Sequence, residues 1–482
     1  MTLGNKIFWL FLFFIVGVFL SSLEIKIIYL VLGELVVVLA FLFLGIHKSS
    51  KTFLILAVLS VLFLVGAVYE NVFDYYRFQK NLPEYDIQKV IEGRIVSYPK
   101  STGKSISFLL KTDERKIISV TTTIFDNFSY GDSVRLESAI SRLNEKNSYL
   151  KKDGVVGTVP FPKIIERKAS QEFSFRKELF KLRENFVSVF NKILNRNESS
   201  LMSGILLGQE STQFPSDLKL AMKNSGTTHL VALSGYNILI LINAIYFALG
   251  FVFKRKTNFI VSLLAIVVFV IMTGGEASVV RAALMGALVL LAQNANRVYN
   301  FKNSVAAAAF AMILFNPKVI VFDVGFVLSF LALFGIVYLA SSLNALVLFK
   351  NEFWDGVKKT FFETFSAQVM VIPVLAAYFG GFSLSGLLSN VIILSLVPIT
   401  MLAGFLVGLA GMIFLPLAKI GGIVLWPLLS FETTVIEFFG SWSLVSVSLG
   451  AAGVVFYYLT ALFFVRKLFL KAKERELNFG FV

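Results

Sequence analysis

A histidine and a serine that are able to act as base and nucleophile lie close together in "THLVALSGYNIL", at His229 and Ser234. A serine nucleophile needs its base within hydrogen-bond reach. Residues five apart on a straight helix differ in direction by about 140°. The two side chains therefore diverge unless the helix breaks at Gly235, and the other histidine, His47, lies in an expected cytoplasmic loop. An intramembrane serine hydrolase that uses Ser234 is kept as an alternative interpretation.

The same residues open a hydrophobic run at about 229–253. Hydrocarbon penalises polar groups unless they have partners or line a cavity. Ser234 and Asn237 are three residues apart and share a helix face, where they offer neutral hydrogen bonds. Gly235 lets another backbone or a ligand approach closely. This pattern favours the polar lining of a conduit, with His229 at its mouth.

Ionisable residues in other hydrophobic runs point the same way. Glu276 and Arg281 lie in "TGGEASVVRAALM", and Asp323 lies in "FDVGFVLSF". Glu276 and Arg281 diverge by about 140° on one helix, so each needs a partner on another span. Ser278 and Arg281 share a face. Buried pairs that fix helix packing are the alternative, which we prefer for Glu34, whereas the others indicate a lined pathway.

Glycines and prolines indicate kinked or broken spans. Pro373 lies inside one hydrophobic run and follows Gln368, Pro398 interrupts the next run, and "AYFGGFSLSGLLSN" places Gly386 and Asn390 between them. Broken helices expose backbone groups that can line a watery cavity. Ordinary kinks are the alternative, because Gly and Pro are common in membrane helices.

Composition identifies the class of protein. Of 482 residues 56% are hydrophobic and 51 are phenylalanine, and the mean hydropathy is +0.77. Lipid must cover such an excess of apolar surface, so this is an integral membrane protein. Much of the net charge of +15 fits the positive-inside rule. With no cysteine and two histidines, disulfides, thiolate sites and a His-rich metal site are excluded. We expect no metal, no cofactor and no catalytic residue.

Four segments follow along the chain. Residues 1–70 hold three hydrophobic runs, and residues 71–170 are polar with short alternating runs such as "SISFLLKT". Alternation at period two predicts about five strands, which fit a small β-barrel such as an OB fold. Residues 171–197 carry an apolar stripe at spacings of three and four beside basic residues, which predicts an amphipathic helix in the membrane interface. Packing of that helix on the barrel is the alternative.

Residues 198–482 are mostly hydrophobic again. The candidate spans lie near 229–253, 258–272, 276–296, 303–316, 319–340, 361–379, 384–413 (which Pro398 could break) and 444–465, with room for one more in 414–443. The predicted fold is a polytopic α-helical membrane protein of about ten to twelve spans with an extracytoplasmic small β-barrel. Basic loops place both termini in the cytoplasm and the β-domain outside the cell membrane.

Taken in order, these stretches resemble the ComEC competence family of DNA-uptake channels. "HLVALSGYNI" resembles the family's "HLLAISGLHV", and "GGEASVVRAALMG", "NPKVIVFDVGFVLSFLALFGI" and "IPVLAAYFGGFSLSGLLSNVIILSLVPI" resemble its later motifs. The resemblance covers about residues 85–413. It implies an inner-membrane channel that passes single-stranded DNA into the cytoplasm during natural transformation. The implied DNA path takes His229, Ser234, Gly235, Asn237, Glu276, Ser278, Arg281, Asp323, Gln368 and Asn390.

This chain departs from the family pattern in two motifs. Asn237 replaces the second histidine, and Val327 replaces a glutamine. Asparagine keeps its hydrogen bonds but cannot titrate. The chain also lacks the metallo-β-lactamase-like domain of longer members, so we expect a separate nuclease, together with a separate DNA receptor and a cytoplasmic helicase or ATPase.

The β-domain offers a weak DNA contact. Its candidate residues are Lys100, Lys104, Lys111, Arg115 and Lys116, in a domain whose acids are comparably numerous. A modest basic excess predicts at most weak binding of DNA by this domain on its own. A transporter of another polyanion or of a lipid-linked polymer is the second alternative to the DNA channel.

Overall fold

The structure is a computed structural model. It describes every residue except 1–2, 24–26, 48–50, 81, 102–104, 124–127, 171, 209–213, 232–239, 241–252, 296–299, 348–350, 443–444, 448 and 480–482. The chain forms two compact units, Met1–Phe180 with Ile245–Val324 and Lys181–Ala244 with Gly325–Val482.

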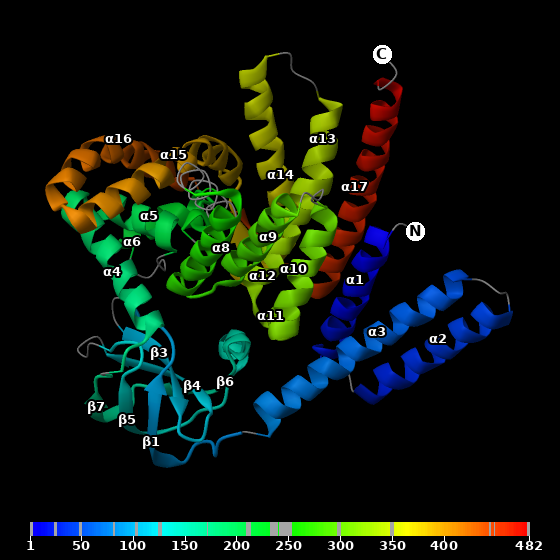
Figure 1. The fold of residues 1–482 in the computed structure, drawn as a ribbon, viewed down its shortest axis with the longest axis horizontal. Coiled ribbons are helices and arrows are strands. Elements are labelled where there is room, and N and C mark those ends of the chain that lie inside the picture. Colours follow the sequence, from blue (N-terminus) through cyan, green and yellow to red (C-terminus); the bar gives the residue numbers. More distant parts are fainter. Residues whose placement is uncertain are drawn as a thin grey trace. The chain divides into compact units, whose positions relative to one another are not determined.

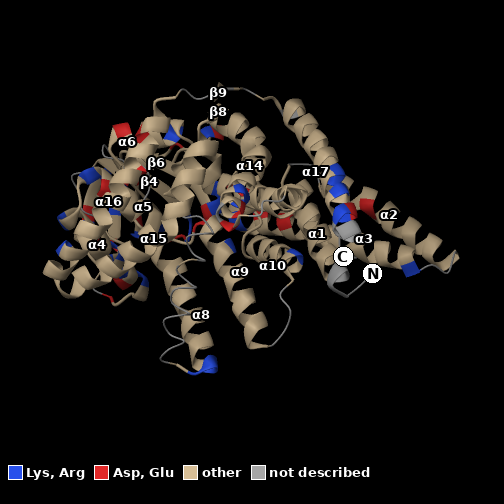
Figure 2. Cartoon of the chain, turned by 90° about the horizontal axis from the view of Figure 1, so that it is seen from above, with Lys and Arg blue, Asp and Glu red and all other residues tan. Residues whose placement is uncertain are grey.

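Apolar helices dominate both units. In the described part of the chain, nine helices are long and apolar enough to cross a membrane, and the shorter Ile7–Ser21 and Phe301–Phe315 are also apolar. The predicted polytopic α-helical membrane protein is therefore confirmed. Figure 2 shows the helices largely without charge, with Lys and Arg gathered at the start of α8 and in the C-terminal half of α17.

The first unit holds seven helices among its described residues. They are α1 (Leu3–Ser21), α2 (Ile27–His47), α3 (Lys51–Asp74, continued by the π-helical turn η1, Tyr75–Gln79), α8 (Arg255–Met272), α9 (Ala277–Asn294), α10 (Phe301–Phe315) and α11 (Val319–Phe322). Helices α2 and α3 run side by side as a hairpin (Figure 1). A side chain at Gly17 or Gly66 would collide with the backbone of the facing helix, so α1 and α3 cross at close backbone distance. Small residues commonly permit such close crossings in membranes.

The predicted strands form one sheet in this unit. They are β1 (Gln88–Ile95), β2 (Lys100–Ser101), β3 (Ser105–Thr112), β4 (Ile117–Thr123), β5 (Ser133–Ala139), β6 (Val155–Pro160) and β7 (Lys163–Lys168). The strand order is β6-β4-β3-β1-β5-β7, with β2 paired to β3. All the pairings are antiparallel except that of β4 with β6. The 3-10 helix η2 (Glu145–Asp153) connects β5 to β6.

The sheet encloses a core of its own. Alternate residues are buried along β3 and β4, as the period-two pattern predicted. Ile95, Leu110, Ile118 and Leu136 are fully buried in it. One isolated bridge, Ser141 to Thr158, joins the chain after β5 to β6. The predicted β-domain is confirmed as a sheet domain, but a continuous ladder that closes it into a barrel is not seen in the described residues.

The second unit is helical. Its elements are α4 (Phe175–Ile193, from Lys181 on), α5 (Arg196–Leu207), α6 (Ser216–Asn224), the 3-10 turn η4 (Thr228–Leu230), α12 (Val324–Phe334, from Gly325 on), the π-helical segment η5 (Gly335–Ala340), α13 (Ser341–Leu346), α14 (Glu352–Phe379), β8 (Gly381–Phe382), α15 (Gly386–Ile413), α16 (Leu415–Gly440), β9 (Val445–Ser446) and α17 (Ala451–Phe479). Helices α15 and α16 pack side by side (Figure 1).

Helix α4 has a partner for its apolar face in this unit. Phe186 stacks on Phe405 of α15 with ring centroids 6.3 Å apart. A side chain at Gly408 would collide with the Phe186 ring and would press on Phe190. The helix was predicted to lie in the membrane interface, and this packing covers with protein much of the apolar stripe on which that prediction rested.

Two candidate spans differ in detail from the sequence prediction. The run at 319–340 is interrupted at Asp323, whose extended backbone (ψ 96°) separates α11 from α12. The run at 384–413 is one helix from Gly386 to Ile413 with Pro398 inside it. A proline removes one backbone hydrogen bond, and neighbouring helices can stabilise the result. The region 414–443 does hold a further candidate span, α16.

Candidate functional site

The polar stretch is preceded by a tight turn in the second unit. Helix α6 ends at Asn224, and Gly226 has φ +68°, a conformation that favours glycine. The backbone N–H of Thr227 donates to Met222 O at 2.9 Å. The hydroxyl oxygens of Ser225 and Thr227 are 2.8 Å apart, and both side chains are fully buried. The turn is therefore held by its own hydrogen bonds before it reaches His229.

Hydroxyl groups join this turn to the start of α15. Ser389 Oγ donates to Ser225 O at 2.7 Å. Ser385 Oγ lies 3.3 Å from Asn224 O and 3.2 Å from Phe439 O at the end of α16. We name this set the hydroxyl junction, and it comprises Asn224, Ser225, Thr227, Ser383, Ser385 and Ser389. Because its hydrogen bonds join three separate parts of the unit, it fixes where the turn lies.

Glycines allow the parts of the hydroxyl junction to meet. A side-chain carbon added at Gly226 would lie 3.1 Å from the Cα of Gly386. One added at Gly386 would lie 3.0 Å from Gln368 Nε2 of α14. The structure thus brings Gln368, predicted as a site residue, next to the turn that carries His229.

The remaining predicted residues of the second unit are placed in part. His229 lies in η4 with an exposed side chain, and its Nδ1 is 3.1 Å from Gly226 O. Asn390 lies one turn beyond Gly386 on α15, is 3% exposed, and its Oδ1 has no hydrogen-bond partner among the described residues. Ser234, Gly235 and Asn237 lie outside the described residues. The paired action of His229 and Ser234 therefore stays a prediction.

Three predicted residues lie at the start of α9 in the first unit. Glu276 is the residue before the first turn, and Ser278 and Arg281 follow on the helix. All three are partly buried. The described site residues thus form two sets, one in each unit, and no pattern in the sequence indicated this division.

Asp323 forms an ion pair with the β-domain within the first unit. Its Oδ2 accepts a hydrogen bond from Lys152 Nζ of η2 at 3.1 Å, and Asp323 is 7% exposed. The ammonium of neighbouring Lys151 lies 4.9 Å from the centre of the Phe322 ring. Asn316 donates to the backbone oxygen of Lys152. The segment from 316 to 323 is therefore a docking surface for η2, and a place for Asp323 on the DNA path stays a prediction.

A buried cluster of charges lies close by in sequence. Lys318 Nζ is 2.7 Å from Glu70 Oε1 and also pairs with Asp74. Ser21 Oγ donates to Glu70 Oε2 at 3.0 Å. The side chains of Lys318 and Glu70 are only 7% and 4% exposed. These contacts join α1, α3 and the chain between α10 and α11, so a structural role explains all four residues.

The η2 helix also holds an acid in an unusual setting. Asp153 keeps contact with solvent, yet the surrounding protein raises the pKa of its carboxyl. Lys152 and Lys100 oppose this rise, and Asp323 adds to it. Lys100, one of the predicted DNA contacts, therefore lies close enough to Asp153 for its charge to act on this acid.

The other basic candidates of the β-domain gather at the β3–β4 hairpin. Lys111 is exposed on β3, and Arg115 lies in the turn with φ +61°. Lys116 Nζ is 2.6 Å from Glu114. Lys104 lies outside the described residues. The carboxylates of Asp113 and Glu114 in the same hairpin offset much of its positive charge, so the hairpin is a weak attractor for a polyanion.

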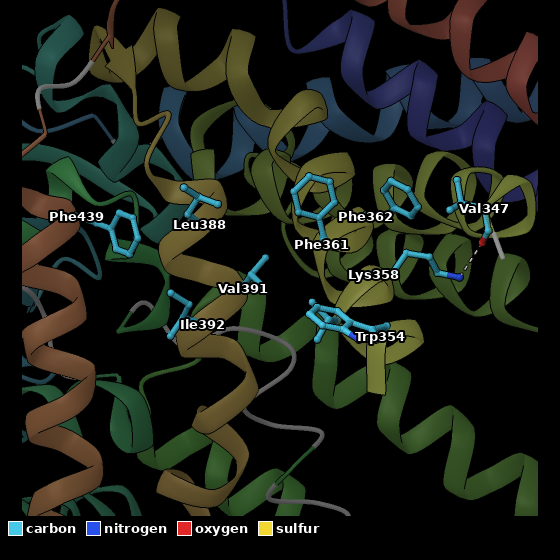
Figure 3. A pocket seen from close by; sticks show the side chains of 10 residues that line it. Val347, Trp354, Lys358, Phe361, Phe362, Leu388, Val391, Ile392 and Phe439 are labelled. Atoms are coloured by element: carbon cyan, nitrogen blue, oxygen red, sulfur yellow. Dashed lines mark hydrogen bonds between the residues drawn. The ribbon is translucent and has the colours of Figure 1, made fainter. Parts of the chain in front are cut away.

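One cavity of about 550 Å³ lies in the second unit. In Figure 3 the side chains of Trp354, Phe361 and Phe362 from α14 lie across from those of Leu388, Val391 and Ile392 from α15. The charged residue of its lining, Lys358, donates to Val347 O at 2.9 Å and pairs with Asp355. An apolar lining with a neutralised cation does not suit nucleic acid, so this cavity is not the candidate DNA path.

Sequence reasoning missed several of these contacts. Glu70, Lys318 and the serines of the hydroxyl junction were not singled out. Charges at the edges of hydrophobic runs and the serine repeat in "GGFSLSGLLSN" were the available signals. Neither signal identifies the distant partners, which lie 49 residues away for Glu70 and Ser21, 248 for Lys318 and Glu70, and 164 for Ser389 and Ser225.

Comparisons with known proteins agree with the family resemblance of the sequence motifs. The family model described as Competence protein matches residues 205–473. ComE operon protein 3 of Bacillus subtilis (strain 168) is 24% identical over 240 residues, which cover 50% of this chain and 30% of that protein. The match thus spans less than a third of that relative's length. No solved structure matches the chain.

Proposed function

We propose a function from the premise that this chain belongs to the Competence protein family, whose model covers residues 205–473 of its 482 residues. In this proposal the chain is a channel that passes single-stranded DNA across the cell membrane into the cytoplasm during natural transformation. The family match carries this proposal, because it extends over most of the candidate spans from α8 to α17. A multi-pass helical protein with polar groups in its spans is a suitable conduit for a polar polymer.

The proposed orientation follows the basic residues. Both termini lie in the cytoplasm of a bacterial cell and the β-domain lies outside the inner membrane. The basic start of α8 and the basic end of α17 (Figure 2) support this orientation under the positive-inside rule. The β-domain then receives DNA, with Lys100, Lys104, Lys111, Arg115 and Lys116 as weak contacts.

The proposed DNA path starts at the turn after α6. His229, Ser234, Gly235 and Asn237 line the outer mouth, and the further lining residues are Glu276, Ser278, Arg281, Asp323, Gln368 and Asn390. A conduit must attract its cargo without holding it tightly. Neutral hydrogen-bonding groups, two cations (His229 when protonated, and Arg281) and two acids (Glu276 and Asp323) give the path little net charge, which meets that requirement. No step on this path breaks a covalent bond.

Single-stranded DNA and the lipid bilayer are the direct partners in this proposal. A separate DNA receptor, a separate nuclease and a cytoplasmic helicase or ATPase are the further partners in this proposal. The cytoplasmic helicase or ATPase, or an electrochemical gradient across the membrane, would supply the force that moves DNA inwards.

Uptake of labelled DNA tests the proposal. A transformable host that lacks this chain is complemented with wild type, with His229→Ala/Arg281→Ala, or with the control His47→Ala, which changes the other histidine at the exposed end of α2. We expect the deletion and the double variant to bind DNA on the surface but to import none, while the control imports normally. Unchanged import in the deletion would refute the channel and favour the hydrolase or polymer-transport alternatives. Labelling of Ser234 by a phosphonate, or competition by polysaccharide, would then separate those two.

A further inference from the structure

A carboxyl group is enclosed between two membrane helices in the second unit. Glu432 lies on α16 and is 0% exposed. Its Oε1 accepts a hydrogen bond from Thr400 Oγ1 of α15 at 2.6 Å. Its Oε2 has no hydrogen-bond partner in the part of the chain that the structure describes. Both helices are candidate spans, so this polar group lies in an apolar surrounding.

No cation neutralises this carboxyl among the described residues. Helix α15 has no ionisable residue. The ionisable residues of the other packed elements are Lys181, Arg183, Glu184 and Lys192 on α4, Arg196 and Glu198 on α5, Asp217, Lys219 and Lys223 on α6, Glu352, Asp355, Lys358, Lys359 and Glu363 on α14, and Lys419 and Glu437 on α16 itself. None of them forms an ion pair or a hydrogen bond with Glu432.

Burial without a counter-charge decides the protonation state. An ionised carboxylate in a low-dielectric interior is strongly unfavourable unless it is paired with a cation. A proton removes that cost, and the neutral acid keeps its hydrogen bond with Thr400. The carboxyl therefore binds a proton in the arrangement that the structure describes.

The same contact joins two points at which helices can bend. Pro398 lies two residues before Thr400 on α15, and Pro427 lies five residues before Glu432 on α16. Each proline removes a backbone hydrogen bond, and kinks concentrate at such positions. Bending at either proline would separate the two helices beside Glu432 and would admit water to the carboxyl.

We propose that Glu432 is a proton-binding site within the membrane, occupied while α15 and α16 are closed and emptied to water when they separate. The carboxyl O–H bond then breaks, the proton passes to water, and the carboxylate remains. In a second part of the proposal, release of the proton accompanies the passage of DNA. Only this second part rests on the transport function proposed above.

Carbodiimide labelling tests the binding site without any transport. A hydrophobic carbodiimide takes the proton of a buried carboxylic acid on one nitrogen and bonds to its oxygen, and an acyl shift leaves a stable acylurea. We treat the purified full chain in lipid vesicles and map the added mass. We expect labelling at Glu432 near neutral pH that falls as the pH rises, and none at that position in Glu432→Gln. The matched control is Glu437→Gln, an exposed residue of the same helix, which should leave the labelling of Glu432 unchanged. Failure to label Glu432 at any pH would overturn the proposal.

DNA import tests the second part. Glutamine is neutral and of the same shape, so Glu432→Gln should fold and insert as wild type does, yet its import should fall to the level of the deletion strain. Import at the wild-type level would show that proton release is not needed and would overturn that part. If wild type itself imports no DNA, the channel proposal fails, whereas the labelling result still decides the proton site.

Discussion

Removal of the buried cation Lys318 is the sharpest test of how the first unit is held together. Lys318 Nζ lies 2.7 Å from Glu70 Oε1, and both side chains are less than a tenth exposed. Lys318→Met keeps the length of the side chain and removes its charge. Glu70 is then left buried without a counter-charge, which costs about 3–5 kcal/mol of folding free energy.

A surface ion pair of the β-domain supplies the matched control. Lys163 and Glu137 are 3.6 Å apart with side chains 79% and 37% exposed. Water solvates both charges there, so Lys163→Met should cost less than about 1 kcal/mol. The difference between the two variants measures the effect of burial rather than the loss of a lysine.

A double variant separates loss of a contact from burial of a charge. Glu70→Gln/Lys318→Met leaves a neutral amide that still accepts from Ser21. Asp74 also loses its partner, but its side chain is 28% exposed and is solvated. The double variant should therefore be more stable than Lys318→Met alone, by about 1–3 kcal/mol.

Unfolding of the purified full chain in mixed micelles, followed by circular dichroism, measures these free energies. Two results would refute the reasoning. One is that Lys318→Met costs no more than Lys163→Met. The other is that the double variant is less stable than Lys318→Met.

Three further predictions follow from contacts of the same kind. Gly226→Ala places a methyl group at φ +68° within 3.1 Å of the backbone of the facing turn, so it should cost about 1–3 kcal/mol and lower DNA import, whereas Gly356→Ala, with open space around it, should do neither. Lys152→Glu should destabilise the first unit by about 1–3 kcal/mol, and the swap Lys152→Asp/Asp323→Lys should recover most of that loss. A swap as unstable as Lys152→Glu would show that the ion pair does not contribute to stability. Asp153 is exposed, but desolvation by the protein around its carboxyl raises the pKa of this group in the folded chain, so the folded state binds more protons and stability should fall as the pH rises above about 4. Asp153→Asn should abolish that fall, and an unchanged pH profile of unfolding would contradict the assignment.

Local patterns were sufficient for most of the elements. The alternation in "SISFLLKT" predicted a strand and produced β3, with every second residue buried. Hydrophobic runs of about 20 residues predicted spans because a helix of that length covers the hydrocarbon core. Both patterns depend on which faces of a segment are apolar, and the sequence contains that information directly.

Breaks in helices were harder to predict than helices. Pro398 suggested a break, but the helix continues through it, since packing on neighbours offsets one missing hydrogen bond. Asp323 ends a helix without any proline or glycine at that position, and its carboxylate meets Lys152, 171 residues earlier. A helix break that depends on a partner far away in the sequence cannot be predicted from the residues around the break.

By itself, the sequence determined that this is a multi-pass membrane protein with a sheet domain and that it resembles a competence protein. Only the tertiary structure decided which polar groups are engaged. It paired Lys318 with Glu70, joined the hydroxyl junction to the turn before His229, and gave the Glu432 carboxyl one hydrogen bond among the described residues. The reason is physical: burial in lipid follows from the hydrophobicity of each segment, whereas the cost of a buried charge depends on partners that only folding brings within about 3 Å.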